Sequence, residues 1–145
     1  MKRLALSLSV LLMLIINLSA ATQPNAKSEE AGVRATVADY IEGYYTGDAG
    51  RMEKSLHPHY LKHVISESDR GVKMTEKTGL QMVQAVRSGA PDLGPSERKE
   101  DITVLDVAGD IASAKLVTSH WTDYMTLAKW NGQWKIVSVV QREQY

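Results

Sequence analysis

A carboxylate and an imidazole that could transfer protons lie close together in the sequence, at Asp123 and His120. Both belong to the turn expected between two strands, beside Trp121 and Tyr124. Alternation along residues 112–120 predicts that His120 faces inward. A carboxylate–imidazole pair has the perturbed pKa values that general acid–base catalysis uses. His120 and Asp123 are therefore the candidate catalytic residues, and the alternative is a salt link that only fixes the end of a hairpin.

The orientation of Asp123 depends on the following turn at Asn131-Gly132. A two-residue type I′ turn pairs Asp123 with Val140 and directs Asp123 inward, whereas a three-residue bulged turn directs Tyr124 inward instead. The two-residue turn is favoured because it places apolar Leu127 opposite an isoleucine. Asp123 and Tyr124 both remain candidates for the inner face.

Two tyrosines on the first predicted helix could bind a ligand. Tyr40 and Tyr44 share the apolar stripe of Val33, Val37 and Ile41, so they should face the interior. A buried phenol needs a partner for its hydroxyl, which can be a ligand carbonyl or simply backbone or water. The candidate ligand-binding residues are Tyr40, Tyr44, His57, Trp121 and Tyr124.

Three histidines lie between positions 57 and 63. His57 stands at a predicted loop-to-helix junction, where it could act as an acid, a base or a ligand donor. His59 and His63 have the i, i+4 spacing of two metal ligands on a helix, but the segment offers neither an adjacent glutamate nor a cysteine as a third ligand. The segment therefore predicts a partly solvated helix face and no metal site.

The elements that would position these residues are three helices followed by a meander of strands. The helices are expected over about 29–46, 51–64 and 75–86, with Leu80 and Val83 on the inner face of the third, and a Gly- and Pro-containing loop follows at 88–97. Turn signals at Gly109-Asp110 and Asn131-Gly132 separate short runs of β-branched and aromatic residues. This order predicts an α+β fold, with three N-terminal helices on a curved antiparallel sheet.

The N-terminus has the features of an export signal. Lys2 and Arg3 precede an apolar run, and Ser19-Ala20-Ala21 suits cleavage after residue 21. We therefore expect a signal peptide at 1–21, a linker at 22–28 and one domain at 29–145, located in the periplasm or secreted. The apolar run is shorter than the roughly 20 residues that span a bilayer, so stable membrane insertion after cleavage is not expected.

Composition excludes several classes of protein. Without Lys2 and Arg3, 15 basic residues face 17 acidic ones, a formal net charge of −2, and no basic stripe predicts binding to nucleic acid. Phosphate-binding glycine loops and a nucleophile elbow are absent, which argues against nucleotide hydrolysis and serine hydrolase chemistry. The chain contains no cysteine, so the core alone must stabilise it.

The chain resembles a known superfamily through motifs whose order and spacing match. These motifs are Tyr40-Ile41-Glu42-Gly43-Tyr44-Tyr45-Thr46-Gly47-Asp48, Leu56-His57-Pro58, the segment 122–129 and Asn131-Gly132-Gln133-Trp134-Lys135-Ile136-Val137. They are similar to the nuclear transport factor 2-like (NTF2-like, SnoaL-like) superfamily, and most to its putative lumazine-binding branch. The resemblance implies a cone-shaped α+β fold that encloses a pocket, often in a homodimer, and it transfers no catalytic residue.

Two functions are compatible with these observations. The first is binding of a small apolar or heteroaromatic ligand in a conical pocket, without turnover and without a cofactor. The alternative is a cofactor-independent enzyme of the isomerase or dehydratase kind, with His120 or Asp123 as base and the phenols of Tyr40 or Tyr44 as oxyanion donors. An outer strip with Tyr124, Val137 and Val139 would further predict a homodimer.

Overall fold

The computed structural model describes residues 26–91 and 93–144, so the predicted signal peptide and most of the predicted linker lie outside the described residues. Its elements are α1 (Ala26–Thr46), α2 (Ala49–Ser55), β1 (Leu56–Ser68), β2 (Gly71–Thr78), α3 (Gly79–Arg87), a short 3₁₀ turn η1 (Pro95–Glu97), β3 (Asp101–Ala108), β4 (Ile111–Val117), β5 (Trp121–Trp130) and β6 (Gln133–Glu143). No helix among the described residues combines the length and hydropathy needed to cross a bilayer.

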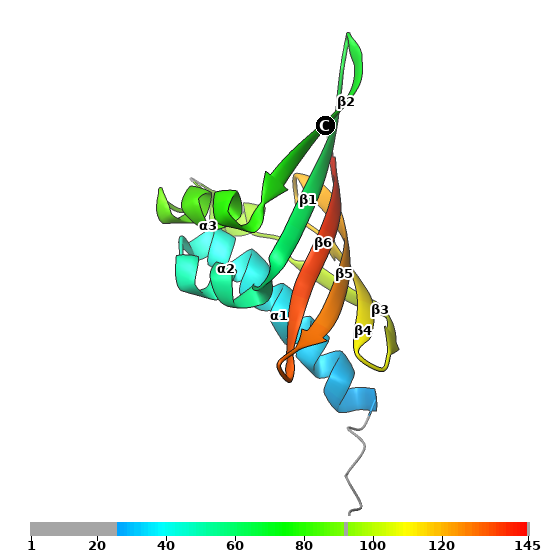
Figure 1. Cartoon of the computed structure of the whole chain (residues 1–145). Helices are drawn as coiled ribbons and strands as arrows, with labels where there is room; N and C mark the ends of the chain where they lie inside the picture. The colour runs from blue at the N-terminus through cyan, green and yellow to red at the C-terminus, as the bar shows by residue number, and fades with distance from the viewer. Residues whose placement is uncertain (1–25, 92, 145) are drawn as a thin grey trace, which may run out of the picture.

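The six strands form one curved sheet in the order β2-β1-β6-β5-β4-β3, and α1, α2 and α3 all lie on one side of it (Figure 1). We call the face that the helices cover the inner face and the opposite one the outer face. Neighbouring strands are antiparallel except β1 and β6, which are parallel. The predicted α+β fold is confirmed, with the parallel pair added.

The stripe predicted on the first helix packs the helix onto the inner face. Val33, Val37, Tyr40 and Ile41 are buried, and Tyr44 packs partly buried against the same core. The opposing side chains come mainly from the central strands and include Leu116, Met125, Leu127, Ile136 and Val139. Gly47 ends the helix with a φ of 71°, a left-handed conformation that glycine adopts at little cost.

The region from 56 to 78 differs from the sequence prediction. It forms a long β-hairpin, β1 and β2, where helices were expected over 51–64 and from residue 75, so His59 and His63 lie on a strand. Tyr60, Lys62 and Val64 are buried while the intervening residues are less so, which is the period of two of a strand. The third helix begins only at Gly79, and Leu80 is exposed while Met82 replaces it in the core.

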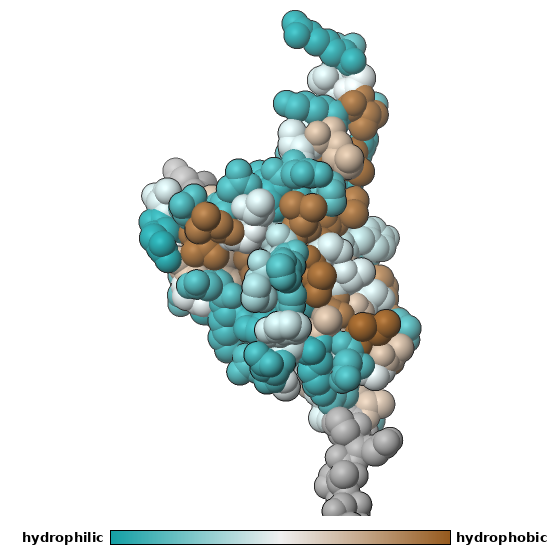
Figure 2. Space-filling view, viewed as in Figure 1, coloured by the Kyte–Doolittle hydropathy of each residue, from teal (hydrophilic) through white to brown (hydrophobic). Residues whose placement is uncertain are grey.

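The tip of this hairpin extends beyond the body of the molecule (Figure 1). Apolar surface continues along the projecting part in Figure 2, in agreement with the exposed side chains of Val72 and Met74 on β2. The lower part of the hairpin joins β6 and brings β1 under α3. The hairpin therefore supplies one wall of the space between sheet and helices.

The final hairpin has the two-residue turn that the sequence predicts. Asn131 and Gly132 have φ values of 50° and 77°, and Leu127 pairs with Ile136. The register then shifts between Thr126 and Leu127, leaving Val137 as a bulge. Asp123 consequently pairs with Gln141 and not with Val140 as expected.

The bulge also corrects the predicted outer strip. Val139 is fully buried on the inner face, opposite Met125, so its predicted outward orientation is wrong. Val140 takes the outward position beside Tyr124, which does face outward as expected. One extra residue in β6 therefore exchanges the faces of the residues that follow it.

Candidate functional site

Two neighbouring rows across the inner face of the sheet carry polar side chains. In one row, Lys77 on β2 pairs with Lys62 on β1, which lies beside Val139 on β6. In the next row, Gln141 on β6 lies between Val64 on β1 and Asp123 on β5. The parallel contact of β1 with β6 thus brings lysines from the first hairpin beside polar residues of the last one.

Lys62 is the centre of a buried polar cluster. Its side chain is 4% exposed, and its Nζ donates to the Tyr40 hydroxyl at 2.8 Å and to Asp123 Oδ2 at 3.3 Å. Trp121 Nε1 donates to the same carboxylate oxygen at 3.2 Å. Four side chains from α1, β1 and β5 are therefore joined through one ammonium and one carboxylate.

Part of the hydrogen-bonding capacity of this cluster is unused. Asp123 Oδ1 lies 3.3 Å from the Lys62 ammonium but accepts no hydrogen bond from any described residue. Buried polar atoms are ordinarily hydrogen bonded, so Asp123 Oδ1 is a buried acceptor that the described residues do not satisfy.

Burial perturbs the ionisable groups of the cluster in the expected directions. Desolvation lowers the pKa of Lys62 and raises the pKa of Asp123, and their mutual attraction opposes both shifts. The pKa of Tyr40 is raised well above its ordinary value, first by burial and then by the neighbouring Tyr60 and Asp123. The phenol of Tyr40 therefore stays protonated and can act as a hydrogen-bond donor or acceptor.

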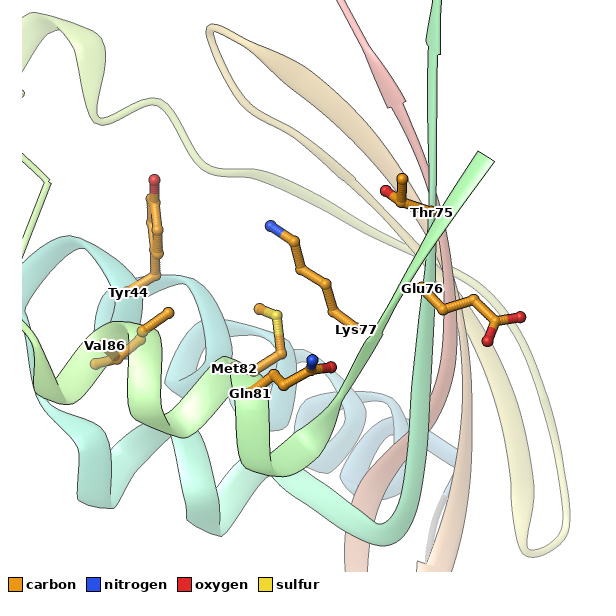
Figure 3. Close-up of a pocket in the computed structure, with 8 residues that line it drawn as sticks. Tyr44, Thr75, Glu76, Lys77, Gln81, Met82 and Val86 are labelled. Carbon is orange, nitrogen blue, oxygen red and sulfur yellow. The ribbon is translucent and has the colours of Figure 1, made fainter. Parts of the chain in front are cut away.

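A pocket opens beside this cluster, between α1, α3 and β2. It has a volume of about 320 Å³ and is lined by Tyr44, Thr75, Glu76, Lys77, Gln81, Met82, Ala85 and Val86. In Figure 3 the Lys77 side chain extends from β2 toward Tyr44 on α1, above Met82 of α3, while Glu76 points to the other side of the strand. The walls are thus aromatic and apolar, with one ammonium directed inward.

A second pocket, of about 220 Å³, shares Tyr44, Lys77 and Met82 with the first. It reaches toward the buried cluster, because Tyr40, Ile41, Lys62, Trp121, Gln141 and Glu143 complete its walls. The Trp121 ring packs edge-on against Tyr44 at a centroid distance of 5.5 Å. Together the two pockets offer the size and lining that small-molecule sites commonly have.

The structure brings together four of the seven candidate residues. Tyr40, Tyr44 and Trp121 line the second pocket, and Asp123 lies behind them in the buried cluster. The sequence left the inward residue of β5 open between Asp123 and Tyr124. Asp123 is 0% exposed and Tyr124 is 54% exposed, so Asp123 is the inward one.

The other three candidates lie elsewhere. His120 is exposed in the turn before β5, 3.8 Å from Glu97, so the predicted His120–Asp123 pair does not form and Lys62 takes its place. His57 lies at the opposite end of the sheet, edge-on to Trp130 at 4.7 Å, and burial lowers its pKa. Tyr124 is on the outer face, where Lys115 lies over its ring.

The pocket residues that were not predicted from the sequence include Lys62, Lys77 and Gln141. Periodicity could not identify Lys62, because residues 60–65 show no alternation of apolar and polar residue types. Lys77 was missed because a helix was expected from residue 75. The inward orientation of Gln141 depends on the bulge at Val137, which could not be predicted from the sequence. Among the described residues, no group of three or more His, Asp or Glu side chains is arranged to hold a metal ion.

Comparison with solved structures shows the fold. An NTF2-like protein of unknown function from Silicibacter pomeroyi superposes with a TM-score of 0.67 at 18% identity, covering 83% of this chain and 99% of that one. One from Shewanella baltica gives 0.65 at 19% identity, covering 83% and 98%. A ketosteroid isomerase-like protein from Erwinia carotovora atroseptica gives 0.56 at 12% identity, covering 81% and 97%.

Comparison of the sequence itself is more specific. No curated protein matches it. The model of the family described as Putative lumazine-binding matches residues 28–141, which span α1 and nearly the whole sheet. The resemblance noted in the motifs is therefore confirmed, and the chain belongs to the Putative lumazine-binding family, with an NTF2-like fold.

Proposed function

We propose that this protein is an exported domain that binds a small, largely apolar heteroaromatic ligand and releases it unchanged. The observation that carries the proposal is the pair of adjoining pockets of about 320 and 220 Å³ that share Tyr44, Met82 and Lys77. Aromatic rings on one side and methionine on another suit a flat, apolar ligand, and a few polar groups can orient it. The description of the family supports the same class of ligand.

A ligand screen with a blocked variant tests this function. Thermal shift and native mass spectrometry against pteridines such as lumazine, other fused heteroaromatics and lipid-like compounds should reveal a compound that raises the melting temperature. Ala85→Trp, at an exposed alanine of the pocket wall, should abolish that shift. Ala31→Trp, at an exposed alanine of α1 that lines neither pocket, is the matched control and should retain it. Equal behaviour of both variants, or no hit at all, contradicts the proposal.

The absence of turnover is inferred from the state of Asp123, the buried carboxylate beside the pockets. Asp123 is fully buried behind the pocket wall, and its Oδ2 already accepts from Lys62 and Trp121. A general base must come within hydrogen-bond reach of the proton it removes, and Asp123 is not among the residues that line either pocket. Recovery of a bound ligand in chemically unchanged form after prolonged incubation is the expected result.

Export is proposed from the N-terminal sequence. A charged start, an apolar run and Ser19-Ala20-Ala21 are typical of a signal peptide. Expression of the full chain in a bacterium should therefore yield a mature protein that begins at Thr22 and is found in the periplasm or the medium. An intact N-terminus on cytoplasmic protein contradicts this part of the proposal.

We also propose that the domain is a homodimer that packs through its outer face. Ile111, Tyr124 and Val140 are 63%, 54% and 46% exposed there, around a hollow of about 380 Å³ lined in part by Thr126 and Val137. Such a surface is more apolar than a solvated sheet needs, and a second copy could cover it. Sedimentation should report a dimer, and Ile111→Glu should give a folded monomer; a wild type that stays monomeric at high concentration contradicts the proposal.

A further inference from the structure

We propose that the ligand of this pocket carries an anionic group, and that Lys62 and Lys77 hold that group from one wall. The proposal rests on the binding function above and names the chemical class of its ligand: a planar aromatic or heteroaromatic acid. It follows from the arrangement of five charged side chains in and beside the pockets, Lys62, Lys77, Glu76, Asp123 and Glu143.

The two lysines are direct neighbours on adjacent strands. Lys62 on β1 and Lys77 on β2 form a cross-strand pair, and both side chains line the second pocket. Like charges opposite one another destabilise a sheet, and the charge of Lys77 is one of the causes that lower the pKa of Lys62, after burial. An anion between the two ammonium groups would convert this repulsion into attraction.

The acidic groups nearby leave Lys77 uncompensated. Asp123 is the ion-pair partner of Lys62, at 3.3 Å. Glu76 is among the residues that line the first pocket, but its side chain points to the opposite face of β2, where it contacts His63 at 3.2 Å. Within the described part of the chain no carboxylate lies within ion-pair distance of Lys77, whose side chain points into the pocket in Figure 3. Lys77 is therefore available to an anionic ligand.

The acidic residue that lines the second pocket has its backbone away from that of the lysine pair. Glu143 lines the second pocket, but it belongs to the row of Trp121, two inward rows from the row of Lys62 and Lys77. At about 3.3 Å per residue this places its backbone about 13 Å along the strands from theirs. Gln141 occupies the row between them and offers an amide to a neutral polar group. The inward backbone positions thus run from the lysine pair through Gln141 to Glu143, while the Lys62 ammonium itself reaches toward Asp123 and lies 6.0 Å from the Trp121 ring centroid.

The orientation of a bound ligand follows from the positions of these side chains. Its anionic group would lie between Lys62 and Lys77, and its ring system would extend past Met82 toward Tyr44 and Trp121. The ammonium groups would gain most where the site is desolvated, since a charge-assisted hydrogen bond is stronger there than in water. A neutral analogue of the same shape would leave Lys77 without that gain.

The test compares an acid with its amide. Isothermal titration of wild type with 2-naphthoate and 2-naphthamide, and with a hit from the ligand screen in its acidic and amide forms, should show at least about tenfold tighter binding of the acid. Lys77→Gln should remove that preference. Lys115→Gln removes the same charge from the outer face and should keep it. Glu143→Gln should strengthen binding of the acid and leave the amide unaffected.

The outcomes separate this inference from the binding function. If acid and amide bind wild type with equal affinity and Ala85→Trp abolishes the binding of both, the proposed binding function is supported and the anion site is contradicted. A preference for the acid that survives Lys77→Gln also overturns it. If neither form of any compound binds, the proposed function falls and the inference falls with it. Because Lys77 is exposed on an edge strand, Lys77→Gln should fold, and a wild-type circular dichroism spectrum verifies this.

Discussion

Two ion-paired aspartates in this protein respond to their surroundings in opposite ways. Asp39, on α1, is bound by Arg51 and Lys54 of α2 at about 3 Å, near solvent. Partial burial is the largest single influence on Asp39 and raises its pKa, but the two cations together outweigh burial, so the pKa of Asp39 is lowered. Asp123 has one cationic partner in the interior, and there burial prevails, so the pKa of Asp123 is raised.

The ion pairs of Asp39 and Asp123 are expected to differ in how much they stabilise the fold. Near the surface, water still solvates the carboxylate and the cations add modest stability. In the interior, desolvation opposes the charged form of both partners, so a buried pair is weak evidence for stability although loss of one partner is costly. We therefore interpret the Lys62–Asp123 pair as part of the binding site and not as a contact that stabilises the sheet.

The largest effect is expected when the buried pair is broken on one side. Asp123→Asn keeps the shape of the side chain but leaves the Lys62 ammonium without its counter-charge, so the free energy of unfolding should fall by about 3 kcal/mol. Urea denaturation at neutral pH measures this. A loss below about 1 kcal/mol, comparable with that of an exposed pair, would remove the difference between the two aspartates.

A smaller net effect is expected when both members of the buried pair are removed. Lys62→Met with Asp123→Leu replaces the two charges by apolar side chains of similar size, and stability should return to within about 1 kcal/mol of wild type. The double-mutant cycle with the two single substitutions gives the coupling energy. Additive losses in the cycle would mean that the two charges do not depend on each other.

The double variant also separates stability from function. If Lys62 serves ligand binding, Lys62→Met with Asp123→Leu should fold well and yet bind the aromatic acid more weakly than wild type does. The experiment is informative because the two outcomes are measured independently, by denaturation and by titration. Retention of the acid preference in this variant would assign the anion to Lys77 alone.

Much of the fold could be predicted because local chemistry decides it. The apolar stripe of α1 has an unambiguous helical period, and Asn131-Gly132 has the positive φ values that its hairpin needs. The inward orientation of Asp123 followed from that turn. These features place Tyr40 and Asp123 on facing surfaces, so these two residues of the buried cluster could be predicted from the sequence.

The first hairpin could not be predicted from spacing because its buried residues fit two periods. Leu56, Tyr60 and Val64 are four apart, a spacing close to one helical turn and also a multiple of the strand period. The short turn before β2 and the pairing of β1 with β6 favour a strand here. The pairing with β6 is a tertiary effect, which spacing within the segment does not reveal. Lys62 and Lys77 were missed for this reason.

The bulge at Val137 shows a second limit. A turn fixes the pairing only until the next irregularity, and the extra residue in β6 changed the partner of Asp123 while leaving its face unchanged. It did change the faces on β6, turning Val139 inward and Val140 outward. Side-chain periodicity cannot locate such a bulge, since valines occupy both positions.

The smallest effect is expected at Asp39 and its ion pairs with Arg51 and Lys54, and it should depend on pH. Because the pKa of Asp39 is lowered below its ordinary value of 3.8, its charged form stabilises the fold above that value, and this contribution is lost as the pH falls through the folded pKa. Asp39→Asn should therefore cost less than about 1 kcal/mol at pH 7, and the difference from wild type should shrink between about pH 5 and pH 2. Asp106→Asn, on exposed β3, removes the same charge without an ion pair among the described residues and serves as control. Urea titrations of the three proteins across this range measure the effect. A difference between Asp39→Asn and wild type that stays constant with pH would show that the Asp39 contacts act through packing and not through charge.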